Sequence, residues 1–134
     1  MRLHYKARKG ETIQFVDVMS LYPSISKYGK FPVAHPVVHV GDACKDKEAC
    51  LRKEGLIKCT IFLPERLCHP LLLFRAIPKL MFSLCRTCAL TSNTGECHDK
   101  TDEERALTGT WVIDEVRLAV QKGYRILEIH EVYE

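Results

Sequence analysis

Residues 112–133 read VIDEVRLAVQKGYRILEIHEVY, and this stretch decides the fold class. Its apolar side chains recur at the spacing of one face of an α-helix: Val112, Val116, Ala119 and Val120. Gly123 is a natural end for that helix, because glycine adopts the left-handed backbone of a helix C-terminus without strain. Residues 124–133 then alternate enough between apolar and polar side chains to predict a β-strand. A helix followed directly by a strand is expected.

Outward from this stretch, the chain predicts further short elements. Segments 55–63, 71–75 and 79–84 have strand character, and the acidic run after Thr101 favours the start of a helix. Residues 13–18 predict another strand, followed by a short helix in which Pro23 suits the first turn. Segment 42–54 is charged and weakly periodic, so it is either a surface helix or a disordered loop.

Strands and helices are mixed without a regular alternation, which predicts an α+β fold. We expect a small mixed sheet with a few helices and a loop that resembles a zinc knuckle. The expected organisation is one domain, 1–134, in three parts. Residues 12–40 form a strand, a turn and a helix, 41–54 a charged loop or surface helix, and 55–134 an α+β region with the knuckle at 85–98.

Composition limits the class of protein. The chain has 134 residues, of which 46% are hydrophobic and 28% charged, which excludes a disordered polyelectrolyte. No apolar run approaches the roughly 20 residues of a membrane span, and no secretory signal is visible, so we expect an intracellular protein, nuclear or cytoplasmic, with no membrane partner. A net charge of +3 permits contact with nucleic acid without arguing for it.

Seven cysteines are many for this length, and their odd number excludes a fully paired disulfide framework. In a reducing compartment, such a set predicts metal ligation together with a few buried thiols. Cys59 lies in an alternating apolar stretch and is expected in the core. Cys44 and Cys50 lie in a lysine-rich segment, where exposed thiols are expected.

The remaining clustered cysteines form the string Cys85-x-x-Cys88, followed after eight residues by Cys97-His98. Two thiolates two residues apart bind one side of a zinc ion, and a later Cys/His pair completes a tetrahedron. We therefore predict structural Zn²⁺ bound by Cys85, Cys88, Cys97 and His98. The fourth ligand is open, since adjacent residues both ligate only with a tight bend.

Cys68 or His69 is the alternative fourth ligand. A set of free thiols in a loop is the competing interpretation of the whole cluster. A redox pair at Cys85 and Cys88 is a further one, although the expected thioredoxin-like context is absent.

Residues 15–25 read FVDVMSLYPSI and place one carboxylate, Asp17, at the end of an apolar strand that turns at once into a helix. Such a junction presents a carboxylate and several backbone N–H groups together, which suits a divalent metal ion and a phosphate. The alternative is a plain strand-to-helix junction in which Asp17 caps the helix.

The sequence of residues 17–25 resembles motif A of the family B DNA polymerases. In that family the aspartate binds the two catalytic Mg²⁺ ions, the backbone after it holds the nucleotide triphosphate, and the tyrosine rejects a 2′-hydroxyl. The resemblance implies a metal role for Asp17, phosphate contacts for Ser20 and Leu21, and the steric gate for Tyr22.

Segments 79–88 and 104–111, and further residues between 109 and 133, resemble the protein-primed polymerases of large self-replicating DNA transposons, linear plasmids and related viruses. The resemblance extends from about Thr12 to Glu134. It covers motif A of the palm and an insertion that, in this family, contacts the terminal protein and DNA.

Two strings of the family have no counterpart in these 134 residues: Tyr-x-Asp-Thr-Asp-Ser, which supplies the second carboxylate, and the lysine helix Lys-x-x-x-Asn-Ser-x-Tyr-Gly. Two-metal phosphoryl transfer needs at least two converging carboxylates. We therefore expect a fragment or domesticated remnant, catalytically incomplete alone, that acts as a zinc-stabilised module binding DNA weakly and without sequence preference, or a protein partner. The alternative is a part of an active DNA-directed DNA polymerase whose remaining palm, fingers and thumb are absent from this chain.

Overall fold

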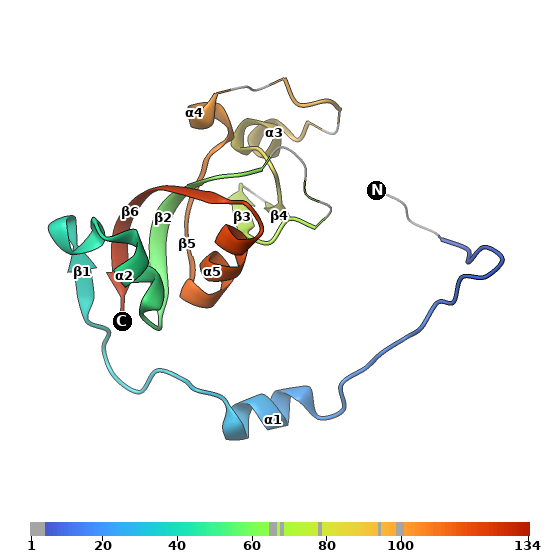
Figure 1. The fold of residues 1–134 in the computed structure, drawn as a ribbon, viewed down its shortest axis with the longest axis horizontal. Helices are drawn as coiled ribbons and strands as arrows, with labels where there is room; N and C mark the ends of the chain where they lie inside the picture. The colour runs from blue at the N-terminus through green and yellow to red at the C-terminus, as the bar shows by residue number, and fades with distance from the viewer. Residues whose placement is uncertain (1–4, 65–66, 68, 78, 94, 99–100) are drawn as a thin grey trace. The chain divides into compact units, whose positions relative to one another are not determined.

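The computed structural model describes residues 5–64, 67, 69–77, 79–93, 95–98 and 101–134, and the chain divides into two units, Met1–Phe31 and Pro32–Glu134 (Figure 1). Each unit is described by itself, and the expectation of a single domain stays a prediction. Within the described ranges, none of the helices has the length and apolar character that crossing a membrane requires.

The first unit has one helix, α1, Leu21–Tyr28, so the short helix expected after Ser20 is confirmed. The strand expected at 13–18 is wrong, because residues 11–18 have no regular secondary structure. A strand needs a neighbouring backbone for its N–H and C=O groups, and neither sheet of the described residues includes this stretch. Phe15 is accordingly 94% exposed.

The second unit is built on a four-stranded antiparallel sheet in the order β1-β6-β2-β5. Its strands are β1 (Val38–Val40), β6 (Arg125–Tyr133), β2 (Leu56–Phe62) and β5 (Leu107–Val112). The strands predicted at 55–63 and 124–133 are confirmed. We did not predict β5, in which small and polar residues alternate with buried ones.

One face of this sheet carries the core. Alternate residues of β2, among them Ile57 and Ile61, are fully buried against α5 (Ile113–Gln121) and α2 (Lys47–Arg52). The helix predicted from the spacing of Val116 and Ala119 is confirmed, and both side chains lie in the core. Gly123 follows that helix with φ 95°, the conformation expected for its end.

A two-stranded hairpin, β3 (Leu73–Ala76) with β4 (Lys79–Phe82), lies beside the sheet and confirms the two strands expected there. The indole Nε1 of Trp111, in β5, donates a hydrogen bond of 2.8 Å to the Leu73 carbonyl. Gly109 makes room for that indole, since a Cβ at this position would lie 2.7 Å from a ring carbon of Trp111. The Trp111 side chain therefore links the sheet to the hairpin.

Two short helices complete the unit: α3 (Arg86–Thr91) and α4 (Asp102–Arg105). Thr101 and Glu104 form a capping box at the start of α4, as the acidic run led us to expect. In the part of the chain that the structure describes, five α-helices and two small sheets give the predicted α+β class.

Segment 41–54 is ordered, with a 3-10 helix, η1 (Gly41–Cys44), leading into α2. The expectation of exposed thiols here is wrong, because Cys44 and Cys50 are both buried. Their sulfurs turn inward and donate to backbone carbonyls, Cys44 to His39 and Cys50 to Ala43. Cys59 is fully buried, as predicted, and burial raises the pKa of its thiol to about 12.

Candidate metal centre and motif A segment

The knuckle sequence brings three thiols together. The ligand atoms of Cys85, Cys88 and Cys97 all lie within 4.8 Å of one another. Cys85 directly precedes α3 and is buried, Cys88 is half-buried on α3, and Cys97 is exposed on the returning segment. The cluster therefore has one side in the protein and one side open to solvent.

The position of Cys85 is set by hydrogen bonds on both sides. The Cys85 N–H donates to the Ser83 hydroxyl at 3.1 Å, and that hydroxyl donates to the Cys85 carbonyl at 2.7 Å. The Thr87 hydroxyl donates to the Glu104 carbonyl at 3.0 Å, and the Cys85 thiol lies 3.9 Å from the same oxygen. These contacts join α3 to α4 and position the backbone of Cys85.

The pKa of the Cys88 thiol is raised above its ordinary value. Burial contributes most, followed by the adjoining Cys97 thiol, and hydrogen bonds with Cys85 and Asn93 offset only part of the rise. Thiols bind metal as thiolates, so a cation among three of them offsets the repulsion between their charges. Three sulfur ligands at knuckle spacing are the donor set of zinc rather than of Mg²⁺ or Ca²⁺. The residues present fit a structural zinc ion.

The fourth predicted ligand is not found in this cluster. His98 and His69 are both exposed, and neither belongs to the group of converging ligand atoms. Cys68, the other alternative, lies outside the described residues. The identity of the fourth ligand stays a prediction.

The motif A segment has a different character, because its candidate residues are all exposed. Asp17 lies in the irregular stretch before α1, and Tyr22, in the first turn of α1, is 83% exposed. Ser20 is the N-cap residue, with φ 58°, and its hydroxyl makes no capping hydrogen bond. Asp17 therefore does not cap the helix, which removes the plain structural explanation considered for it.

No group of three or more converging ligands among the described residues contains Asp17. One carboxylate alone supplies only a fraction of the ligands of a magnesium site. The metal, phosphate and steric-gate roles of Asp17, Ser20, Leu21 and Tyr22 stay predictions.

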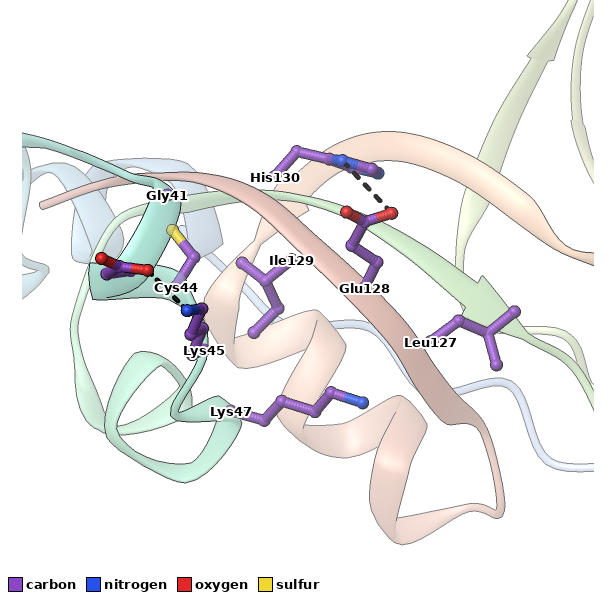
Figure 2. Close-up of a pocket in the computed structure, with 9 residues that line it drawn as sticks. Gly41, Cys44, Lys45, Lys47, Leu127, Glu128, Ile129 and His130 are labelled. Atoms are coloured by element: carbon purple, nitrogen blue, oxygen red, sulfur yellow. Dashed lines mark ion pairs between the residues drawn. The ribbon is translucent and has the colours of Figure 1, made fainter.

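A hollow of about 480 Å³ lies elsewhere, between η1 and the first half of β6 (Figure 2). Among its lining residues, Lys45 pairs with Asp42 at 2.6 Å, the Lys47 ammonium donates to the Ile126 carbonyl at 2.8 Å, and the His130 ring lies 3.9 Å from the Glu128 carboxylate. His130 is half-buried, and its Nε2 lies 2.8 Å from the Thr60 hydroxyl. None of the predicted site residues lines this hollow.

Comparison with known proteins gives one match. The family model described as DNA polymerase type B, organellar and viral, matches residues 2–134, nearly the whole sequence. No curated protein and no solved structure matches significantly.

Proposed function

The chain belongs to the organellar and viral type B DNA polymerases, and from that membership we propose that it is a polymerase-derived module, catalytically incomplete alone, that is stabilised by zinc and binds DNA or a protein. The protein-primed polymerases of transposons, linear plasmids and related viruses are the proposed parent type. The segment that resembles motif A is the palm portion, and residues 37–134 are the proposed insertion.

The pairing of residues 37 and 134 supports the insertion. The Val37 N–H donates to the Glu134 carbonyl at 2.7 Å, and the Glu134 N–H donates to the Val37 carbonyl at 2.9 Å. The side chains of Lys53 and His39 bind the Glu134 carboxylate at 2.5 and 2.9 Å. Because these two backbone segments lie side by side, the unit between them can be inserted into another fold without distorting either one.

The observation that carries catalytic incompleteness is that, among the described residues, Asp17 belongs to no group of three or more converging ligands. Two-metal phosphoryl transfer places two ions about 3.5–4 Å apart, which one carboxylate does not hold. No ligand cluster of the described residues includes Asp17, and its exposed surroundings do not exclude water. Primer extension with Mg²⁺ or Mn²⁺ tests this, with Asp17→Ala as the control. Extension that disappears in the variant would overturn the proposal.

The second candidate is a working part of an active DNA-directed DNA polymerase, completed by palm, fingers and thumb from elsewhere. The exposed apolar side chains of the motif A segment favour this second candidate. Phe15, Met19 and Tyr22 are all exposed, although side chains of this type are typically buried in a complete palm. In that case a separately expressed chain carrying the two-aspartate motif should restore extension with the wild-type chain but not with Asp17→Ala.

The metal proposal is one structural zinc ion per chain, held by Cys85, Cys88 and Cys97 with His98, Cys68 or His69 as fourth ligand. The converging sulfurs support it. Elemental analysis of protein purified under reducing conditions should give one zinc per chain. Absence of zinc in folded, reduced protein would overturn it. Magnesium is proposed only for the parent polymerase, at Asp17.

For DNA, the charge distribution supports weak and non-specific binding. The net charge is +3, but many cations already pair with carboxylates: Lys45 with Asp42, Arg52 with Glu48, Lys53 with Glu134, Lys58 with Glu131, Arg117 with Asp114 and Arg125 with Asp102. These pairs engage six of the 20 lysines and arginines, and the chain has a positive excess of only three charges over its 17 acidic residues, so affinity should be low and sensitive to salt.

For a protein partner, the support is an apolar row across the sheet face opposite the core. Val38 pairs with Tyr133, Tyr133 with Leu56, and Leu56 with Val112, so the row crosses all four strands. Val38, Leu56 and Val112 are 51%, 45% and 42% exposed. Such exposed apolar rows occur at protein interfaces. The uncharged substitution Leu56→Gln should weaken capture of a protein partner and leave DNA binding unchanged.

The predicted intracellular location, nuclear or cytoplasmic, stays a prediction.

A further inference from the structure

The chain reverses between Cys88 and Cys97, and one side chain organises that reversal. Helix α3 ends at Ser92, which has the left-handed φ of 55°. The backbone N–H of the next residue, Asn93, then donates to the Cys88 carbonyl at 2.9 Å. The turn is thereby tied to the same residue whose sulfur belongs to the thiol cluster.

The Asn93 amide contacts three parts of the knuckle at once. Its Nδ2 lies 3.6 Å from the Cys88 sulfur and donates to the Glu96 carbonyl at 3.2 Å, while its Oδ1 accepts from the Gly95 N–H at 2.9 Å. Glu96 directly precedes Cys97. The side chain therefore connects the sulfur of Cys88 with the backbone that presents Cys97.

We propose that Asn93 is a positioning residue of the metal site: its amide orients the Cys88 thiolate by an N–H···S hydrogen bond and holds the turn that delivers Cys97. The inference rests on the proposed zinc site. A donor aimed at a coordinating sulfur stabilises the anionic ligand and fixes the direction of its lone pairs, as outer hydrogen bonds do at metal sites generally. Among side chains of this length, only that of asparagine carries both an N–H group to donate to the Cys88 sulfur and a carbonyl oxygen to accept from the Gly95 N–H.

Two variants separate the contacts of the amide nitrogen from that of the amide oxygen. Asn93→Asp keeps an oxygen that accepts from the Gly95 N–H but replaces the nitrogen that donates to the Cys88 sulfur and the Glu96 carbonyl with a carboxylate oxygen. Asn93→Ala removes all three contacts. Thr91→Ala is the matched control, because the Thr91 hydroxyl donates to the Thr87 carbonyl at 2.9 Å within α3 and is exposed. Fluorescence of the single tryptophan, Trp111, reports that the sheet is folded in each variant.

The experiment is a Co²⁺ titration of the full chain under reducing conditions, followed by competition with Zn²⁺. Loss of an outer hydrogen bond at a metal ligand typically weakens affinity about 10–100-fold, and this is the expected result for both Asn93 variants. The thiolate-to-cobalt absorption band should also shift in both, because sulfur that has lost an N–H partner donates more strongly. Thr91→Ala should match the wild-type chain.

Affinity and band position equal to wild type in Asn93→Asp would overturn the role of Asn93. Weakened affinity with an unchanged band in both variants would also overturn it, since that pattern belongs to a residue that only supports the turn. If the wild-type chain binds neither ion, the zinc proposal itself is overturned and the role of Asn93 with it.

Discussion

Removing the metal should open the knuckle and leave the sheet folded. The hydrophobic core contains Cys44, Cys50 and Cys59 but none of the three clustered cysteines. Helix α3 is attached mainly through α4, whose Arg105 guanidinium reaches the carbonyls of Leu63 and Pro64 at 3.5 and 3.4 Å. A chelator should therefore release α3 and the turn after it, with no loss of core contacts.

The size of the effect follows from the length of chain that the metal closes. A metal bridge from Cys85 to Cys97 closes a loop of about 12 residues. A cross-link of that length lowers the conformational entropy of the open knuckle, which raises its free energy by about 3 kcal/mol. Because about 1.4 kcal/mol corresponds to a factor of ten in an equilibrium constant, the opening of the knuckle should become roughly 100-fold more favourable on chelation.

Amide hydrogen exchange measured with and without a zinc chelator tests this. Peptides covering 86–97 should lose protection by about two orders of magnitude, and peptides covering β2, Leu56–Phe62, should keep theirs. Equal loss of protection across β2, β5 and β6 would show that the metal supports the whole unit. Unchanged exchange at 86–97 in zinc-loaded protein would show that the metal lies elsewhere.

Four further outcomes are expected. Cys50→Ser should lower the free energy of unfolding by about 1–3 kcal/mol in a urea titration, because it buries a hydroxyl in the core, yet the zinc content should stay the same. The Lys58 ammonium, 2.7 Å from Glu131, and then the Tyr133 hydroxyl hold the pKa of Glu131 below its ordinary 4.5. As the pH falls, the Glu131 carboxylate is therefore protonated in the unfolded chain before it is protonated in the folded chain. Its contribution to the free energy of unfolding is complete above about pH 4.5 and is lost at lower pH. In Glu131→Gln, the urea midpoint should fall less than in the wild-type chain between about pH 5 and pH 3. DNA affinity should fall with rising salt with a log–log slope of about −0.9 per phosphate contact, and a flat salt response would exclude phosphate contacts. Asp17→Ala should leave the melting temperature unchanged, since its exposed carboxylate caps nothing; a clear drop would reveal a contact that this structure does not contain.

Elements whose determinants are local could be predicted from the sequence. The helix at 113–121 and the strand after it depend on spacing and on Gly123, all of which stand within one stretch of chain. The cysteine spacing likewise predicted the three sulfurs that converge, because two of them lie one helical turn apart and the third returns through a short turn. Asn93 was missed, although an asparagine followed within two residues by glycine is a turn signal.

Non-local determinants account for the failures. Cys44 and Cys50 looked exposed because their neighbours in sequence are charged, but the core that buries them comes from β2, β6 and α5. Residues 13–18 have the composition of a strand, but no strand of the described residues pairs with them. Strand β5 was missed because Gly109 interrupts the alternation of apolar and polar residues that predicts a strand. The reason for a glycine here is seen only in the folded structure, where the Trp111 ring occupies the space that a side chain at position 109 would fill.

Among the described residues, two that are not glycine have a clearly positive φ, Ser20 and Ser92, and each stands at one of the two candidate sites. That conformation costs of the order of 1–3 kcal/mol for such a residue, so it persists where the chain must bend for another purpose. Ser20 begins the helix of the motif A segment, and Ser92 begins the turn that returns Cys97 to its partners. At both segments the local sequence builds the bend, and in the proposed roles it supplies part of a ligand set. The second carboxylate of a magnesium site would have to come from outside the motif A segment, because Asp17 is the one acidic residue of that segment. The fourth ligand of the thiol cluster is either the neighbouring His98 or a residue before the knuckle, Cys68 or His69.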